Sequence, residues 1–226
     1  MSAEQTGGDR LPTEDHHEGG FRPISELADE VRGVPEADIA RGGPHYRQFI
    51  SQVRGLMDRV RLANPSDELA LETIATLKEL NDKLDAAVVD EWSTPLWTRY
   101  DVPARGNITV PPYAVHHVGP DGIDATITFR NYHLGGNSAA HGGQIAVGFD
   151  ELIGMAAAVY AGAVTRTASL TVDYRSITPL NTRLRLRAWA ERQEGRKVFL
   201  RATLHDGDRL CAEANGLFIV LNPGQQ

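Results

Sequence analysis

The longest apolar stretch of the chain lies between residues 141 and 164. From Ile145 to Val164 only Asp150 and Glu151 carry a charge. On a helical wheel the bulky residues of this stretch share one side, as expected of a helix that packs on a sheet: Ile145, Phe149, Leu152, Ala156 and Val159. Because glycines and the two acids interrupt the stretch, it predicts a helix inside a globular domain and not a membrane span.

Asp150 lies on the opposite side of this predicted helix, in a row of small residues that includes Gly143, Ala146 and Gly154. A carboxylate without a partner is costly to bury, so an acid in such a row indicates a functional site. The motif His141-Gly142-Gly143 precedes the helix, where backbone N–H groups have no partner within the helix and suit an oxyanion. A simple glycine turn followed by a hydrogen-bonded polar residue would give the same pattern.

Alternation of apolar and polar positions predicts strands on both sides of the helix. Two precede it, at 113–118 and 123–131, and four follow it, at 165–174, 182–191, 197–206 and 209–221. The turn Gly119-Pro120-Asp121-Gly122 joins the first two strands as a hairpin. Two strands, one long helix and four more strands predict an α+β fold in which an antiparallel sheet wraps one helix.

The N-terminal part of the chain has a different pattern. Residues 1–40 are acidic and rich in glycine and proline, and predict a flexible arm. Residues 41–91 contain two amphipathic stripes separated by Asn64-Pro65-Ser66, which predict a helical hairpin with Ser66 as N-cap of its second helix. Residues 92–112 are expected to be an extended linker to a main domain at 113–222. The hairpin is expected first to cover the sheet; extending a dimer to a tetramer and closing an acyl tunnel are the alternatives.

Charge and cysteine content narrow the function. The net charge of −7 argues against nucleic acid as the main partner. Residues 163–226 nevertheless carry ten Lys and Arg against six Asp and Glu, a net +4, which would suit a polyanionic small ligand. The single cysteine, Cys211, lies in an alternating strand pattern and is predicted to fill the core. The first residues lack the features of a secretory signal, so a cytoplasmic protein is expected.

No metal site is predicted. His16-His17 has no third ligand at a useful spacing, and His116-His117 occupy adjacent positions of one strand, so their side chains point to opposite faces.

The central motifs resemble those of the hotdog-fold thioesterases, specifically the PaaI-like acyl-CoA thioesterase branch. The likeness covers roughly residues 105–222. It depends on His141-Gly142-Gly143 with an acid nine positions after the histidine, on the strand that begins at Thr167, on Pro179-Leu180, and on Glu194-Gly195-Arg196-Lys197. The N-terminal 90 residues lie outside it.

The resemblance implies an enzyme that hydrolyses acyl-CoA thioesters, with roles for particular residues. Asp150 would activate water or attack the thioester carbonyl, the Gly142 N–H would polarise that carbonyl, and Thr167 would hold the water or the acid. Relatives place Asn or Gln six residues before the histidine, where this chain has Gly135, so that role passes to Asn137. The other residues expected to bind substrate are His141, Gly143, Arg175, Arg196 and Lys197, the last three for the phosphates of coenzyme A.

The resemblance further implies a homodimer or homotetramer with the site between subunits, and no cofactor, since coenzyme A belongs to the substrate. Three other functions stay open. An acyl-CoA-binding or regulatory hotdog domain would not need the acid. A hotdog hydratase or dehydratase would need a His-Phe-Pro loop or an Asp/His pair, and neither occurs around His141. A metal enzyme would need the ligand cluster that the sequence lacks.

Overall fold

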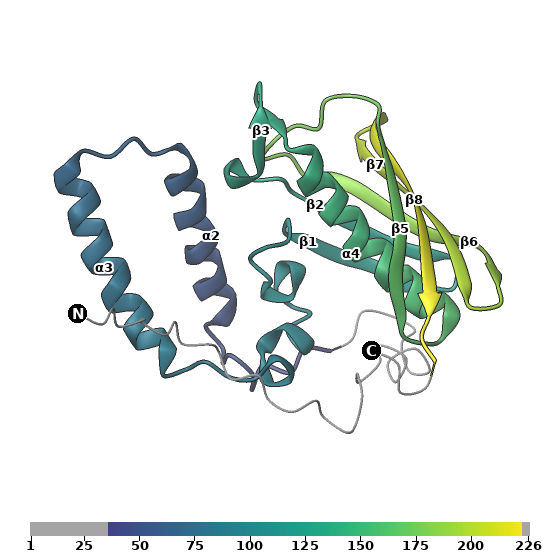
Figure 1. The fold of residues 1–226 in the computed structure, drawn as a ribbon, viewed down its shortest axis with the longest axis horizontal. Coiled ribbons are helices and arrows are strands. Elements are labelled where there is room, and N and C mark those ends of the chain that lie inside the picture. The colour runs from purple at the N-terminus through teal and green to yellow at the C-terminus, as the bar shows by residue number, and fades with distance from the viewer. Residues whose placement is uncertain (1–35, 223–226) are drawn as a thin grey trace, which may run out of the picture.

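The structure is a computed structural model that describes residues 36–222, so most of the predicted N-terminal arm lies outside the described residues. One curved antiparallel sheet holds a long helix against its inner face, and two further helices stand at one side of this unit (Figure 1). The predicted α+β hotdog fold is therefore confirmed.

The sheet has six strands in the order β1-β2-β6-β7-β8-β5, and every neighbouring pair is antiparallel. The strands are β1 (Tyr113–Gly119), β2 (Gly122–Ile127), β5 (Thr165–Tyr174), β6 (Leu184–Glu194), β7 (Lys197–Asp206) and β8 (Arg209–Val220). A separate hairpin, β3 (Leu134–Gly136) with β4 (Ala139–Ala140), precedes the central helix. Strand β5 forms one edge of the sheet.

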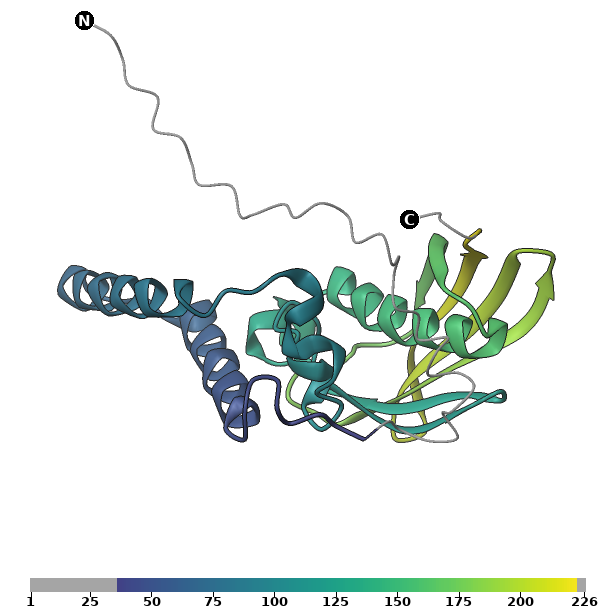
Figure 2. The ribbon, with the colours of Figure 1, turned by 90° about the horizontal axis from the view of Figure 1, so that it is seen from below.

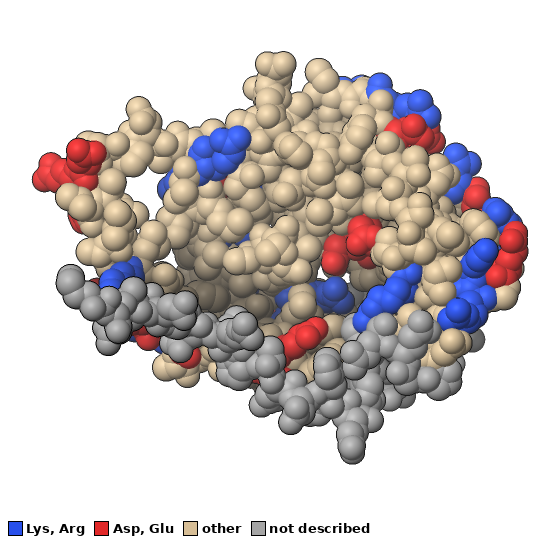
Figure 3. All heavy atoms as spheres, viewed as in Figure 1, with Lys and Arg blue, Asp and Glu red and all other residues tan. Residues whose placement is uncertain are grey.

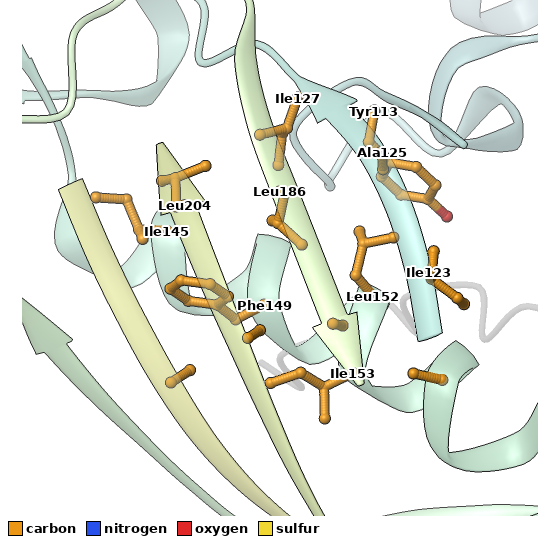
Figure 4. Packing of buried hydrophobic residues seen from close by; sticks show 14 of the residues in the cluster. Tyr113, Ile123, Ala125, Ile127, Ile145, Phe149, Leu152, Ile153, Leu186 and Leu204 are labelled. Atoms are coloured by element: carbon orange, nitrogen blue, oxygen red, sulfur yellow. The ribbon is translucent and has the colours of Figure 1, made fainter. Parts of the chain in front are cut away.

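The central helix α4 (Gly142–Ala161) packs on the sheet through its bulky side, as its sequence predicts. Ile145, Phe149, Leu152 and Ile153 are buried, and Figure 4 shows them beside sheet residues such as Leu186. Two glycines allow the helix and the sheet to approach each other closely. A Cβ atom at Gly148 would lie 2.7 Å from Ile127, and one at Gly216 of β8 would lie 2.8 Å from Ile153.

The two predicted N-terminal helices form as α2 (Tyr46–Leu62) and α3 (Asp67–Asp85), and Ser66 caps α3 by accepting a hydrogen bond from Leu69 N–H. Covering the sheet was the first role expected of them, and that prediction is wrong. Short 3₁₀ helices, η3 (Pro103–Gly106) and η4 (Asn131–His133), provide the surface on which α2 docks, while α3 projects away from the domain (Figure 2).

The helices do not cover the sheet because α2 docks elsewhere, through polar contacts that an amphipathic pattern does not reveal. Arg54 of α2 is buried and donates to the carbonyls of Pro103 and Asn107 at 3.0 and 2.8 Å. Asp58 pairs with Arg130, which precedes η4. These contacts fix α2 against the segment between the helices and the sheet.

Several predicted boundaries shift for local reasons. The helix α4 begins at Gly142 because His141 is its N-cap. Strand β6 runs to Glu194, since Gly195 takes a φ of 58° and closes a tight turn with Arg196. Strand β2 ends at Ile127, after which the chain turns into η4.

Among the described residues, α4 is the one helix long and apolar enough to span a membrane by length and composition. The core helix of a globular domain has the same properties, and the bulky side of α4 lies in the core.

Candidate active site

The entrance of α4 contains one free backbone donor. His141 is extended at φ −66° and ψ 131°, and its Nδ1 accepts a hydrogen bond from Gly143 N–H at 3.0 Å. Its carbonyl accepts from Gln144 N–H and Ile145 N–H. The Gly142 N–H donates to no acceptor within the described part of the chain. Of the two glycines, Gly142 therefore has the N–H that is available to a ligand, at the positive end of the helix dipole.

Asp150 lies on α4 within reach of strand β5. The hydroxyl of Thr167 donates to Asp150 Oδ1 at 2.9 Å, and Asp150 is half-buried. No Lys or Arg among the described residues forms a salt bridge with this carboxylate. The sequence predicts an acid on the small-residue side of a buried helix; in a single chain this row of small residues is partly open.

A β-bulge directs Thr167 toward the helix. The pairing of β5 with β8 shifts register between Thr167 and Ser169, so that Thr167 lies opposite Phe218, a core residue. Beyond the bulge, Leu170 and Val172 pack against the core from alternate positions. Strict alternation from these residues would turn Thr167 outward, so the extra residue is what brings it to Asp150.

Gly142 and Asp150 are too far apart to act on one carbonyl within one chain. They are eight residues apart on the same helix, and at 1.5 Å per residue their backbones are separated by about 12 Å. The structure thus places both predicted groups on α4, but not side by side.

The neighbouring acid, Glu151, is engaged in a different cluster. Tyr113 of β1 donates to Glu151 Oε2 at 3.0 Å, and the guanidinium of Arg105 lies 3.6 Å from the same oxygen. Burial is the main cause that raises the pKa of Tyr113. A cavity of about 150 Å³, lined by residues including Arg105, Tyr113 and Met155, lies beside this cluster. Asp150 is therefore the acid of the pair that is free for chemistry.

Arg105 was not found from the sequence, because its place depends on backbone geometry. Ala104 and Arg105 have φ values of 50° and 53°, and Gly106 has 90°. Such left-handed conformations are rare for residues with a side chain, and no sequence pattern indicated them here.

The loop before α4 has no room for a side chain at Gly135, the position where the resemblance implies an Asn or Gln. Gly135 lies against His141, where a Cβ atom would come within 2.8 Å of the His141 Cα, so this backbone arrangement leaves no room for a side chain there. Asn137 and Ser138, with φ values of 47° and 59°, form the exposed turn between β3 and β4. Asn137 is exposed near the entrance of α4, and its role stays a prediction.

The three predicted phosphate ligands do not meet within one chain. Arg175 follows Tyr174, whose hydroxyl donates to the Gly142 carbonyl, so it lies at the entrance end of α4. It already pairs with Glu213 at 2.7 Å. Arg196 donates to the Val220 carbonyl at the other end of β8. From Ala212, opposite Tyr174, to Val220 is eight residues of strand, or about 27 Å. Lys197 is the next residue after Arg196 and therefore lies at the same end of the sheet.

The segment that supports the entrance of α4 contains residues that the sequence patterns did not indicate. Asp58 of α2 accepts from Arg130 and from Tyr132 N–H, and His133 Nδ1 accepts from Arg130 N–H at 2.8 Å. The His133 carbonyl in turn accepts from His141 N–H. Burial lowers the pKa of His133 to about 4. A chain of contacts therefore runs from α2 to the N-cap of α4.

Comparisons with known proteins show which proteins this chain resembles. The family model "Thioesterase superfamily" matches residues 137–213. Acyl-coenzyme A thioesterase THEM4 of Xenopus laevis is 44% identical over 85 residues, which are 37% of this chain and 38% of that protein. The Rattus norvegicus protein of the same name is 35% identical over 85 residues, 37% of this chain and 36% of the relative. The match thus spans less than two fifths of these curated relatives.

A crystal structure of a thioesterase superfamily protein superposes with a TM-score of 0.68 at 22% identity, covering 82% of this chain and 94% of the other. The hotdog domain alone is too short for such coverage, so the similarity of fold extends into the N-terminal helices.

None of the described residues form a group of three or more His, Cys, Asp or Glu that could hold a metal ion. The family match lies on the segment that contains the α4 entrance, Asp150 and Thr167, and the fold is that of a solved superfamily member. The thioesterase superfamily model thus matches residues 137–213, which lie in a domain with the hotdog fold.

Proposed function

We propose that this protein hydrolyses acyl-CoA thioesters to the free acid and coenzyme A, without a cofactor, in composite sites of a homodimer. The observation that carries the proposal is the state of Asp150. It is half-buried, held by the Thr167 hydroxyl and not paired with any described Lys or Arg. The curated relatives are named acyl-coenzyme A thioesterases, which supports this class of substrate.

The separation along α4 is the argument for two subunits. Because Gly142 and Asp150 are about 12 Å apart, a thioester polarised by one cannot be attacked through the other in the same chain. In an antiparallel pair of α4 helices, residue numbers rise along one helix while they fall along the other. The numbers of any two residues that face each other therefore have the same sum. Gly142 would face the partner's Asp150 if the helices cross at Ala146, which belongs to the row of small residues.

The edge of the sheet supports the same arrangement. Strand β5 carries Thr167 and has no neighbour on one side, and an unpaired edge is suited to pairing with a second copy. A two-fold axis there would also bring Arg196 and Lys197 of one chain toward the entrance end of the other, where Gly142 and Arg175 lie.

The chemistry follows from these positions. Gly142 N–H donates to the thioester oxygen, where negative charge develops. Asp150 either takes a proton from the water that attacks the carbonyl carbon or attacks it directly to form an anhydride, which water then cleaves. The C–S bond breaks in both routes, and coenzyme A leaves as a thiolate that takes up a proton.

An assay of free thiol released from short, medium, long and aromatic acyl-CoAs tests the activity. The wild type is expected to be active on at least one class, and Asp150→Asn is expected to lose most of this activity. The matched control is Glu151→Gln, which changes the neighbouring acid and preserves an acceptor for Tyr113. If the wild type hydrolyses none of these acyl-CoAs, acyl-CoA binding without hydrolysis becomes the proposed function.

The composite site has a separate test at Gly142. This residue is the first of α4, where proline is tolerated, and His141 before it is already extended. Gly142→Pro removes the N–H and is expected to lower turnover roughly 100- to 1,000-fold, as for the loss of one oxyanion donor. Gly142→Ala is the control, because it adds the same Cβ atom near Tyr174 but keeps the N–H.

Mixing the inactive Asp150→Asn and Gly142→Pro proteins under conditions that exchange subunits gives the decisive result. Each mixed dimer would contain one site with both wild-type groups, so activity should recover to about a quarter of the wild-type value. If no activity returns while mixed dimers are demonstrated, the two groups do not belong to a shared site.

A further inference from the structure

Helix α3 lacks a packing partner within the described chain. None of its 19 residues is buried. Several large apolar side chains are exposed on it: Leu69 by 52%, Leu71 by 68%, Ile74 by 62%, Leu80 by 42% and Leu84 by 39%. In proteins a helix takes most of its stability from the packing of its apolar side chains, so these exposed side chains are expected to be covered.

Helix α2 has an uncovered stripe as well. Its inner face is fixed to the domain through Ile50 and Arg54, which are buried. On the adjacent face Phe49, Leu56 and Val60 are exposed by 41, 38 and 59%. These residues are spaced by seven and four positions, so they form one continuous stripe along the helix. Figure 3 shows an open gap between α2 and α3, into which neither helix inserts side chains that close it.

The two helices carry opposite charges. Helix α2 contains four Arg and one Asp, a net +3, whereas α3 contains two Lys and six Asp or Glu, a net −4. In Figure 3 acidic side chains gather at the tip of α3, and basic ones lie at the end of α2 across the gap. Two α3 helices would therefore repel each other, and α3 is electrostatically matched to α2.

We propose that α2 and α3 form a docking surface for the same two helices of a second copy of this chain, with each α3 packed on the partner's α2. A two-fold axis satisfies both apolar stripes and both charge matches at once, because the contact of α2 with α3 occurs twice. The result is a four-helix bundle that joins two hotdog domains. An anionic membrane surface fits poorly, since the exposed stripe of α3 is accompanied by acids.

Variants with one introduced cysteine each test this contact directly. Leu56 and Ile74 lie near the middle of α2 and α3, so their side chains come close in the bundle whichever way the helices run. The Leu56→Cys protein, carrying an affinity tag, is mixed with untagged Ile74→Cys protein and treated with a short bismaleimide. The expected product is a tagged–untagged dimer near twice 24.7 kDa. The natural Cys211 is buried, and the wild type treated in the same way measures its background.

The matched control is Glu79→Cys in place of Ile74→Cys, because Glu79 lies on the polar side of α3. Its mixture with Leu56→Cys should give at least five-fold less of the mixed product. Equal yields from the two mixtures, or no mixed product, would overturn the proposal.

A second measurement does not depend on cross-linking. The double variant Ile74→Glu and Leu80→Glu should sediment as a smaller species than the wild type at equal concentration, and Glu72→Asp with Glu79→Asp, which keeps the charge of α3, should not. Sedimentation of the first variant identical to wild type would also overturn the proposal. Acyl-CoA hydrolysis is assayed independently, so a failure of the proposed function is distinguishable from a failure of this contact.

Discussion

At the scale of single residues, the site depends on how two hydrogen bonds are distributed. His141 uses the Gly143 N–H to cap α4 and leaves the Gly142 N–H free, and Thr167 donates to Asp150. The hydroxyl of Thr167 orients the carboxylate without neutralising it. A hydrogen bond to a charged group contributes about 1.5 to 3 kcal/mol, so its loss should be visible in turnover.

Thr167→Val keeps the shape of the side chain and removes the donor. It should lower kcat for acyl-CoA hydrolysis roughly 10- to 100-fold, with little change in KM, because the substrate contacts are unaffected. Thr167→Ser retains the hydroxyl and should keep most of the activity. Equal kcat values for the Thr167→Val variant and the wild type would remove Thr167 from the mechanism.

At the scale of elements, η4 connects the N-terminal helix to the entrance of α4. It is held by Asp58 of α2, and its last residue, His133, accepts the N–H of His141. His133 is 1% exposed, and burial is the main reason that its pKa falls to about 4. Its neutral form is the one that fits, since Nδ1 accepts from Arg130 N–H.

This histidine predicts a pH dependence of folding. The unfolded chain binds a proton at His133 near pH 6.5 and the folded protein only near pH 4, so its contribution to stability is present above pH 6.5. Between these values the free energy of unfolding should fall as the pH falls, by up to about 1.4 kcal/mol per pH unit. Denaturant unfolding of wild type and His133→Gln checks this. The same slope in both proteins would contradict it.

The elements differ in how far the sequence predicts them. The regular strands and α4 follow from alternation and from the apolar side of one helix, and Ser66 indicates the start of α3. The bulge at Thr167, the left-handed turn at Arg105 and the docking of α2 do not follow, because each depends on tertiary contacts. Thr167 itself was found through the family resemblance. Asp150 was found from its charge in an apolar helix, whereas His133 and Asp58 left no comparable signal.

At the scale of the whole molecule, one chain holds the separated groups of the proposed site and an uncovered pair of helices. The donor at Gly142 and the acid at Asp150 lie at different heights of one rigid helix, and the basic residues lie at opposite ends of the sheet. These distances are fixed by the regular geometry of α4 and β8, so no side-chain movement brings the groups together. The active unit is therefore expected to contain at least two chains.

Dilution should separate the chains and abolish hydrolysis. Specific activity is expected to fall over the concentration range in which sedimentation shows monomers, because each monomer has only separated groups. A covalently cross-linked dimer, prepared before dilution, should keep its specific activity. Full activity of a demonstrated monomer would contradict the composite site.

The glycines at the contact of α4 with the sheet connect distant positions to the proposed site. A methyl group at Gly148 would lie 2.7 Å from Ile127 and one at Gly216 would lie 2.8 Å from Ile153, so either these side chains or the helix must shift. A shift of the helix would move Gly142 and Asp150 together, although neither had been altered. Gly148→Ala and Gly216→Ala are therefore expected to lower hydrolysis although no residue of the proposed site is changed.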